Sequence, residues 1–388
     1  MTRLVLLATN LARGGAEIEV AQLAGALHGR GWNVSVVSLL RPSALESELA
    51  AIGVPVFSLG MRPGKPNPLA WARLARILRR TKPHILHGHM FHANLMARGI
   101  RLICPVPVVI STIHSIAESS RRSADVGRRS AGVGRRDWLY RVTDRLSDAT
   151  VCVSAAAAER HAAARAVGRG RLRVIPNGVD TARFRPDAAR RARMRDTLGI
   201  GDEFAWLAAG RLMWKKDYPT MLDAFAGRRA GVLLITGEGP LEAELRSLAR
   251  ELGARVRFLG LREDIPELMN ACDGLLLSSV AEGLPMALLE AAASGLPSIA
   301  ADVGGVREAV CDERTGYVVP PGDPAALATA MSRLAELPAD ARQEMARAAR
   351  EHAVARFDLR AIAARWVETY TELLERARLS DMEPGRDA

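Results

Sequence analysis

Residues 274–297 read GLLLSSVAEGLPMALLEAAASGLP, and this stretch decides the fold. It opens with a short apolar run, Gly274–Ser278, which has the length and composition of a buried strand. A loop with a glycine and a proline follows, and then an alanine- and leucine-rich helical segment stops at Gly295 and Pro297. A buried strand joined by a short loop to a helix is the unit from which parallel α/β sheets are built.

The same alternation of apolar runs and longer amphipathic segments continues along the chain. In the first half the apolar runs are Leu4–Ala8, Asn33–Leu39, His84–His87, Val106–Ile113, Thr150–Val153 and Leu172–Ile175. In the second half they are Phe204–Ala209, Gly231–Thr236, Val256–Leu259, Gly274–Ser278 and Pro297–Ala300. The pattern predicts an α/β protein with two successive doubly wound, Rossmann-like domains.

The length of the chain also indicates two domains. Its 388 residues exceed the size at which a single hydrophobic core usually keeps growing. Turn-forming residues at 176–180, Pro-Asn-Gly-Val-Asp, mark the junction. We expect an N-terminal domain over residues 1–180, a second domain over 181–358, and over 359–388 a helix that ends in a frayed tail, Ser380–Ala388.

The net charge favours anionic partners. It is formally +11, which suits nucleotide phosphates, polyprenyl phosphates or acidic lipids, although arginines spread over solvated faces would give the same value. Only 4% of the residues are aromatic, and no aromatic side chains are interleaved with basic ones to stack on bases. We therefore expect no nucleic-acid partner.

Arginine pairs at 121/122, 128/129 and 135/136 concentrate charge in residues 117–136. This segment either holds a phosphate-bearing acceptor or an anionic membrane surface, or is a solvated insertion. No stretch approaches the ~20 apolar residues that span a bilayer, and Leu4–Ala8 is too short for the core of a signal peptide. Four cysteines without paired spacing are expected to be buried thiols. The sequence predicts a cytoplasmic protein, with 117–136 as its candidate contact to the inner face of the plasma membrane.

Ligands of doubly wound domains bind at the carboxyl ends of the strands, so the loops that follow the apolar runs are the candidate sites. After the first run, Gly14 and Gly15 open a helix without the G-x-G-x-x-G spacing, and they either touch a ligand or only form a turn. After the first run of the second half, Gly210-Arg211 and Lys216 place cations where a diphosphate could lie, unless the loop is simply solvated.

The clearest constellation is the pair Glu282 and Glu290, with seven residues between them. Glu282 lies in the glycine-containing loop, and Glu290 lies further along the helix axis. The helix start between them offers free amides and a positive dipole to a phosphate. An accidental exposed pair of glutamates is the alternative, which the adjacent Gly283 and Pro285 disfavour.

We expect no metal ion. The chain contains no Asp-x-Asp sequence to bridge a metal to a diphosphate. His87, His89 and His92 lie close together in sequence, but no carboxylate or cysteine nearby completes a ligand set. Cations and helix dipoles would then stabilise a departing diphosphate.

Taken in this order, the motifs resemble a retaining family 4 glycosyltransferase of the GT-B fold, and the resemblance covers almost the whole chain. Glu282 and Glu290 match the E-x7-E motif of that family. The other similar segments are Gly14-Gly15-Ala16-Glu17, Pro176-Asn177-Gly178-Val179-Asp180, Gly210-Arg211-Leu212 with Lys216, Gly237-Glu238-Gly239-Pro240, and Gly304-Gly305 before Glu308.

The resemblance implies an architecture and a set of roles. Two Rossmann-like domains would face across a cleft, the first binding the acceptor and the second the nucleotide sugar, with C-terminal helices crossing back to the first. The implied catalytic residues are Glu282 at the transferred sugar, His114 near it, and Arg211 and Lys216 at the diphosphate. The implied donor-binding residues are Gly15 at the phosphates, Arg262 with its neighbour Leu261 at the base, Gly283, Leu284, Pro285, Met286 and Ala287 at the sugar and phosphate, and Glu290 at the ribose. Gly14 and Gly237 belong to the same implied donor-binding set.

The resemblance also implies the reaction. A hexose or N-acetylhexosamine would pass from a nucleotide diphosphate sugar, for which we expect UDP, to a hydroxyl group of a glycan or lipid-linked acceptor in polysaccharide or lipopolysaccharide assembly. The configuration at the anomeric carbon would be retained, and no cofactor would be needed. The sequence departs from the common family pattern at Lys216-Asp217, where the family often has Lys-Gly, and at Gly283-Leu284-Pro285, where it often has Gly-Phe-Pro.

Three alternatives remain at this point. A nucleotide-sugar epimerase or a glycan phosphorylase could use the same fold, because a fold does not fix a function. A phosphorylase would need a lysine for pyridoxal phosphate, and the sequence offers no such context. A non-catalytic scaffold that binds anions through its basic surface is the third alternative, and the intact glutamates, arginine and lysine argue against it.

Overall fold

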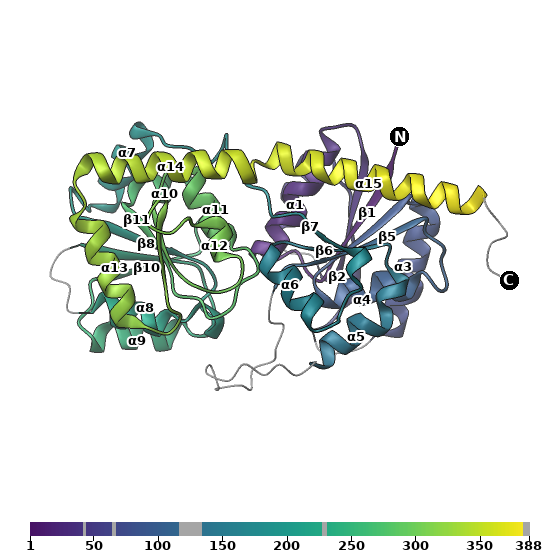
Figure 1. The fold of residues 1–388 in the computed structure, drawn as a ribbon, viewed down its shortest axis with the longest axis horizontal. Coiled ribbons are helices and arrows are strands. Elements are labelled where there is room, and N and C mark those ends of the chain that lie inside the picture. The colour runs from purple at the N-terminus through teal and green to yellow at the C-terminus, as the bar shows by residue number, and fades with distance from the viewer. Residues whose placement is uncertain (42–43, 64–66, 116–133, 227–230, 383–388) are drawn as a thin grey trace. The chain divides into compact units, whose positions relative to one another are not determined.

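The computed structural model of the protein describes residues 1–388 except 42–43, 64–66, 116–133, 227–230 and 383–388. The chain divides into two compact units (Figure 1). Unit 1 comprises Met1–Gly178 and Leu359–Ala388, and unit 2 comprises Val179–Asp358. The chain therefore leaves unit 1 inside the turn-rich segment 176–180 and returns to it where the C-terminal segment begins.

The sheet of unit 1 contains seven strands in the described part of the chain, in the order β3-β2-β1-β4-β5-β6-β7, and all neighbours are parallel. The strands are β1 (Arg3–Ala8), β2 (Asn33–Leu40), β3 (Val56–Met61), β4 (Ile85–His89), β5 (Val108–Ile113), β6 (Ala149–Cys152) and β7 (Leu172–Val174). The chain adds strands outward from β1 to β3 and then returns to β4 beside β1. The order of addition reverses between β1 and β4, which is the switch point of this sheet.

Helices bury both faces of that sheet. Along β1, Leu4 and Leu6 point into one core and Val5 and Leu7 into another, because successive side chains of a strand alternate between its faces. The first core is completed by α1 (Gly15–His28), α2 (Leu45–Ala51) and α15 (Leu359–Met382), and the second by α3 (Pro68–Thr81) and α4 (Phe91–Ile100). A smaller core lies among α4, α5 (Arg135–Thr143) and α6 (Ala155–Ala163).

The sheet of unit 2 contains six parallel strands in the described residues, in the order β10-β9-β8-β11-β12-β13. They are β8 (Ala205–Ala209), β9 (Val232–Thr236), β10 (Val256–Gly260), β11 (Gly274–Leu277), β12 (Ser298–Ala301) and β13 (Gly316–Val319). Its switch point lies between β8 and β11. The first strand of this unit and the strand in the stretch 274–297 are thus neighbours.

The helices of unit 2 also cover both faces of its sheet (Figure 1). Leucine and aromatic side chains of α8 (Tyr218–Phe225), α9 (Glu242–Glu251) and α13 (Pro324–Glu336) form one core with the strands. The remaining helices are α7 (Ala188–Leu198), α10 (Ile265–Ala271), α11 (Met286–Ala293), α12 (Val306–Ala309) and α14 (Ala339–Phe357), among which α7 packs on α10 and α11 packs on α14.

The predicted class, two doubly wound α/β domains, is confirmed, and three details differ. The prediction missed β3 and β13, which are edge strands of the two sheets. Cys311 is only partly buried, whereas the other three cysteines are buried as expected. Helix α15 continues to Met382, so residues 380–382 are not part of a tail. None of the helices in the described residues combines the length and apolar composition needed to span a bilayer.

Candidate functional site

The switch point of unit 2 brings two loops together at the carboxyl ends of β8 and β11. The β8 loop carries Arg211 and ends in a short 3-10 turn at Trp214–Lys216, and the β11 loop carries Glu282. Because β8 and β11 are hydrogen-bonded neighbours, their following loops must lie side by side. Crevices at such points are the usual ligand sites of doubly wound sheets.

The two loops are joined by hydrogen bonds between main chain and side chain. The Ser278 hydroxyl lies 2.8 Å from the carbonyl oxygen of Lys216 and 2.7 Å from that of Asp217, and it can donate to either. The amide of Val280 donates to the carbonyl of Lys215 at 2.9 Å. The sequence predicted the β8 cations and the β11 glutamate as separate features, and the structure shows that Ser278 ties their loops together.

Lys216 and Glu282 form an ion pair at this junction. The distance from Lys216 Nζ to Glu282 Oε1 is 2.7 Å, and the Ser279 hydroxyl donates to the same oxygen at 2.8 Å. Both charged side chains are mostly but not fully buried, with 20% and 15% of their surface exposed. A partly shielded pair of this kind keeps both side chains in a defined position while leaving them open to a ligand.

Tight backbone approaches fix the position of the β8 loop. Gly210 and Gly237 have positive φ angles of 156° and 127°. A Cβ atom on Gly237 would lie 2.1 Å from the carbonyl oxygen of Gly210, and one on Gly239 would lie 2.3 Å from that of Leu212. The hydroxyl of the buried Tyr218 donates to the Gly210 carbonyl at 3.0 Å. Only glycines in the β9 loop let the two loops pack this closely.

Glu290 lies on α11, on the same segment as Glu282. Its side chain is partly accessible. Burial raises the pKa of this carboxyl to about 7, and the positive charge of Arg183 acts in the opposite direction. The carboxyl is therefore balanced between its neutral and ionised forms near neutral pH. Arg183 also lines a nearby cavity of about 410 Å³ together with Asp264 and Glu267.

The start of α11 is the candidate anion-binding element of this site. Its N-cap position is Pro285, which supplies no side-chain cap to the first turn. The first amides of a helix have no partner within the helix and carry its positive dipole. The carbonyl of Gly283 accepts the amide of Gly305 at 2.9 Å, so the glycine loop after β12 supports the loop that leads into α11.

Leu261 and Arg262 lie further away along the sheet. They follow β10, the edge strand, which is two strands from β8. The Leu261 side chain is exposed, and Arg262 Nε donates to Asp264 at 2.8 Å in a two-pronged pair that raises the pKa of the arginine. Arg211 is exposed beside the junction of the two central loops. The structure thus brings Lys216 and Glu282 together, whereas Arg262 forms its ion pair with Asp264 instead.

Unit 1 has its own candidate residues at the carboxyl ends of β1 and β4. Helix α1 begins at Gly15 with Gly14 as its N-cap. Gly14 has an extended backbone, and a Cβ atom there would lie 2.5 Å from a carboxylate oxygen of Glu17, so a larger residue would displace the end of the Glu17 side chain. After β4, Met90 has φ 71° and ψ 160°, a backbone region that is essentially restricted to glycine. Strain of this kind is typical of functional loops.

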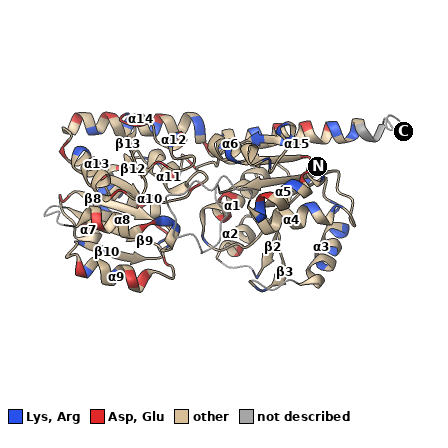
Figure 2. Cartoon of the chain, turned by 60° about the horizontal axis from the view of Figure 1, so that its bottom comes forward, with Lys and Arg blue, Asp and Glu red and all other residues tan. Residues whose placement is uncertain are grey.

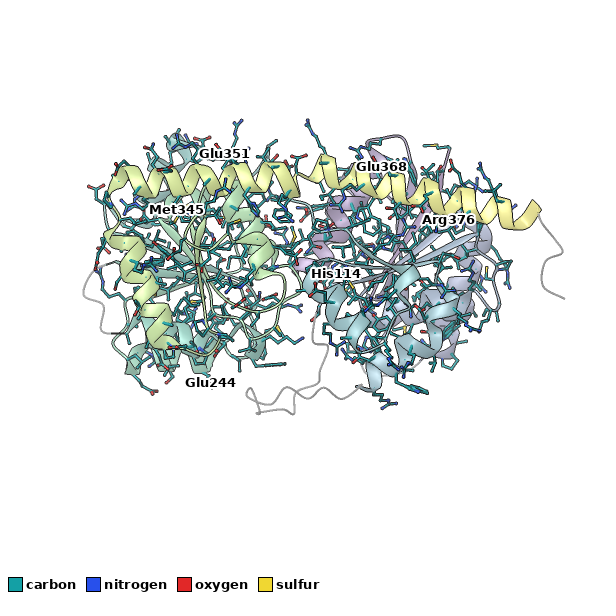
Figure 3. All side chains as sticks on the ribbon, viewed as in Figure 1. His114, Glu244, Met345, Glu351, Glu368 and Arg376 are labelled. Carbon is teal, nitrogen blue, oxygen red and sulfur yellow. The ribbon has the colours of Figure 1, made fainter. Side chains whose placement is uncertain are left out.

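Histidines cluster next to that strained residue. His89 Nδ1 lies 3.1 Å from His114 Nε2, and Figure 3 labels His114, which follows β5 in unit 1. His89 Nε2 and His114 Nδ1 are buried and have no hydrogen-bond partner among the described residues. Burial lowers the pKa of His89 well below its usual value and that of His114 to about 4. Both rings are therefore neutral at physiological pH, and one must donate to the other.

His87 has a structural role, because both of its ring nitrogens form hydrogen bonds inside unit 1. Its Nδ1 lies 2.7 Å from the hydroxyl of Tyr370 on α15, and its Nε2 lies 2.7 Å from the hydroxyl of Thr112. Within the described residues, no three His, Cys, Asp or Glu side chains lie together as metal ligands would. The sequence missed Ser278, Ser279 and Tyr218 as site residues, since only their position after a strand or in a helix start could have pointed to them.

Comparison with known proteins agrees with this arrangement. Residues 13–183 match the family described as Glycosyltransferase Family 4, and residues 190–352 match Glycosyl transferases group 1. Glycogen synthase from Mycobacterium tuberculosis is 31% identical over 299 residues, which are 74% of this chain and 69% of that protein. D-inositol 3-phosphate glycosyltransferase from Acidothermus cellulolyticus is 31% identical over 374 residues, which are 88% of this chain and 82% of that protein.

Solved structures share the fold. The Anabaena protein HepE in complex with UDP-glucose has a TM-score of 0.83 and 23% identity, over 96% of this chain and all of that one. Two Rossmann-like domains with this order of motifs define a glycosyltransferase of the GT-B fold. The chain belongs to glycosyltransferase family 4, and the family and the GT-B fold expected from the sequence are confirmed.

Proposed function

We propose that the protein is a retaining glycosyltransferase that transfers a hexose or N-acetylhexosamine from a UDP-sugar to a hydroxyl group of its acceptor. The observation that carries the proposal is the Lys216–Glu282 ion pair at the switch point of unit 2. A cation and a carboxylate held 2.7 Å apart at a loop junction can bind the two halves of a nucleotide sugar where they meet, the diphosphate and the sugar.

The leaving diphosphate would be stabilised by cations and by a helix start. In the proposed complex, Lys216 and the exposed Arg211 contact the phosphate oxygens, and the first amides of α11 face them. The bond from the anomeric carbon to the diphosphate oxygen breaks, and the diphosphate takes the electron pair. Preorganised donors at such a position typically contribute a factor of about 10²–10³ each to the rate. We propose that these groups act without a metal ion.

Glu282 and Glu290 would divide the recognition of the donor. Glu282, fixed by Lys216 and Ser279, accepts hydrogen bonds from the hydroxyls of the sugar. Glu290 binds the ribose hydroxyls, and its pKa of about 7 lets it accept from them when ionised. The acceptor hydroxyl then forms a bond to the anomeric carbon and passes its proton to the departing diphosphate oxygen, with retention of configuration. The roles of Leu261, Arg262, Gly237, Gly14, Gly15 and His114 at the donor stay predictions of the family resemblance.

For the acceptor we propose a growing cell-surface glycan or a lipid-linked sugar. Among the relatives, an Escherichia coli protein that is 27% identical over 274 residues is named as a galactosyltransferase acting on GlcNAc-diphosphoundecaprenol. A lipid-linked acceptor would place the protein at the inner face of the plasma membrane. The segment 117–136 that the sequence singled out lies largely outside the described residues, which resume at 134.

The proposal is tested by thermal unfolding of the purified protein with UDP, GDP and ADP and their sugars. A ligand that binds only the folded state raises Tm, by an amount equivalent to about 2.7 kcal/mol at a concentration of 100 Kd. We expect a shift with uridine nucleotides that Arg211→Ala weakens and Glu290→Ala abolishes. A shift with guanosine nucleotides alone would overturn the choice of UDP, and no shift with any nucleotide would overturn the function.

Product analysis separates transfer from epimerisation. Incubation with a UDP-sugar and a mixture of glycan and lipid-linked acceptors should release UDP and give a glycoside with the anomeric configuration of the donor, in the presence of a metal chelator. An inverted product would contradict retention. A changed sugar still attached to UDP would instead identify an epimerase.

A further inference from the structure

We propose that Asp217 is a positioning residue for the donor. Its carboxylate keeps the diphosphate away from the start of α8 and so directs it to Lys216 and the start of α11. This role rests on the proposed function, because it concerns the diphosphate of that donor, and it belongs to a residue to which neither the sequence nor the comparisons gave a role. Its effect is repulsion of a wrong binding mode, which is a general way of making a site selective.

Two helices begin at the switch point of unit 2. Helix α8 follows β8 and helix α11 follows β11, and each has eight residues. Both helix starts carry the positive end of a helix dipole, which attracts anions. A diphosphate could therefore bind at either one. The chain must distinguish the two starts if the donor is to bind in one position only.

The two helix starts differ in charge and in the donors that they offer. Helix α11 has Pro285 at its N-cap, a residue without charge. Helix α8 has Asp217 at its N-cap and Pro219 in its first turn. None of the described amides of that turn donates to the Asp217 side chain, and Pro219 has no amide hydrogen to offer an anion. The start of α8 thus carries a carboxylate and lacks one donor, whereas the start of α11 carries no carboxylate.

The backbone conformation of Asp217 does not by itself explain its charge. Asp217 has φ 46° and ψ 49°, in the left-handed helical region. Glycine adopts this conformation without strain, whereas a residue with a Cβ atom does so at a cost in free energy. Asparagine tolerates it as aspartate does. Glycine or the neutral asparagine would therefore serve the turn, so the negative charge of Asp217 needs a separate explanation.

Three hydrogen bonds fix Asp217 in this strained conformation. Its amide donates to the Trp214 carbonyl at 3.2 Å, and its own carbonyl oxygen lies 2.7 Å from the Ser278 hydroxyl. The hydroxyl of Thr220 donates to the carboxylate oxygen Oδ2 at 2.7 Å. Strained residues persist where their surroundings fix them in this way, and such residues cluster at ligand sites. The carboxylate is therefore a fixed negative charge directly after Lys216.

Opposite charges on consecutive residues make the two sides of the β8 loop unlike. Lys216 attracts phosphate oxygens, and Asp217 repels them from the side of α8. Figure 2 shows residues of both signs on the elements of unit 2. The local charge at each helix start, rather than the total charge of the unit, therefore determines where the anion binds. In the favoured position the diphosphate faces α11, as the proposed transfer requires.

The test compares Asp217→Asn and Asp217→Gly with the wild type by calorimetric titration with UDP and with uridine. Loss of the repulsion should tighten UDP binding by about threefold to tenfold in both variants and leave uridine binding unchanged. The gain should shrink at about 1 M salt, which screens charges over a few ångströms. Asp217→Gly removes the strain as well as the charge, so the two variants should differ in thermal stability and agree in UDP affinity.

Steady-state transfer assays measure whether the carboxylate also positions the donor. With the UDP-sugar that gives transfer, both KM and kcat should fall in the two Asp217 variants. The donor then binds more tightly, but part of it lies with its diphosphate at α8, where transfer does not occur. A purely structural role in capping α8 would change stability without this combined fall in KM and kcat.

The matched control is Asp223→Asn, which removes the same charge from an exposed position of the same helix, about 9 Å further along its axis. It should leave UDP affinity, KM and kcat at their wild-type values. UDP affinity that is unchanged in the Asp217 variants, or raised equally by Asp223→Asn, would overturn the proposal, and so would tighter binding without a fall in kcat. Absence of UDP binding by the wild type would instead overturn the proposed function, and the role of Asp217 with it.

Discussion

Lys216 shows how much one side chain at the proposed donor site depends on its neighbours for its position. Its ammonium group is held by Glu282, which is itself held by Ser279. The main chain at Lys216 is held by the Ser278 hydroxyl. The charge of Lys216 is therefore positioned before any ligand binds, and positioning of this kind reduces the entropy lost when a diphosphate arrives.

Removal of that charge should be far more harmful than removal of the charge next to it. We expect Lys216→Ala to lower kcat/KM for the nucleotide sugar by about 100-fold or more, because a preorganised donor to the leaving group is lost. Lys215→Ala is the matched control, since the Lys215 ammonium lies 5.7 Å from the centre of the Trp214 ring instead. Steady-state kinetics of both variants measure the difference. Equal losses of kcat/KM in Lys216→Ala and Lys215→Ala would contradict the proposed role of Lys216 at the diphosphate.

The sequence predicted charged site residues better than the residues that position them. Glu282 and Glu290 are visible because their spacing and the glycine loop between them form a pattern along the chain. Ser278 and Ser279 carry no comparable signal, since the end of a buried strand often has serines. His89 pairs with His114 only because β4 and β5 are neighbours in the sheet, and no linear spacing encodes that contact.

At the scale of elements, the two loops that follow β8 and β9 behave as one packed unit. We expect Gly237→Ala to destabilise unit 2 by about 2–4 kcal/mol and to lower donor affinity, because the new methyl group would collide with the Gly210 carbonyl. Gly253→Ala separates the effect of the collision from the backbone strain that any side chain meets at a positive φ. Gly253 also has a positive φ, 61°, but it has open space around it. Thermal unfolding should show a loss of only about 1 kcal/mol for Gly253→Ala, and a similar loss in both variants would contradict the role of the collision.

Elements in the centre of each sheet were predictable, and those at its edges were not. The central strands β1, β8 and β11 are continuous apolar runs because helices cover both of their faces. The edge strand β3 contains Ser58 and Gly60 and is only partly buried, and β13 is four residues long. Neither has enough apolar sequence to stand out, so their places follow from pairing with β2 and β12.

At the scale of the whole molecule, a buried carboxyl lies at the point where the chain leaves unit 1. Glu19 on α1 is 4% exposed and accepts the amide of Gly178 at 3.1 Å. Gly178 is itself tightly placed, since a Cβ atom there would lie 3.1 Å from Cα of Leu359, the residue at which the chain returns. Burial raises the pKa of Glu19 to about 8, against the opposing effect of the Gly178 amide.

This raised pKa predicts the direction of a pH effect. The folded protein holds the Glu19 proton more tightly than the unfolded chain, so the resulting stability is complete below about pH 4.5 and is lost as the pH rises towards about 8. The Glu19→Gln variant keeps an acceptor for the Gly178 amide but does not titrate. Over this interval we expect wild-type stability to fall relative to Glu19→Gln by about 3–5 kcal/mol.

Thermal unfolding of both proteins from about pH 5 to pH 8 measures the difference. The exposed Glu46 on α2 provides the control, because Glu46→Gln should run parallel to the wild type at every pH. Parallel curves for wild type and Glu19→Gln would mean that Glu19 is ionised throughout and would remove the proposed link between this carboxyl and the junction.

The division of unit 1 between the two ends of the chain has a consequence for biosynthesis. Its first core needs Trp366 and Tyr370 of α15, which leave the ribosome only after all of unit 2. The first core of unit 1 therefore stays incomplete and partly exposed to solvent until α15 has been synthesised. Unit 2 is continuous in sequence and can fold completely before that. The half of the enzyme that is translated second is the half that can finish folding first, and ribosome-bound intermediates of this protein should expose unit 1 to chaperones for most of the time that translation takes.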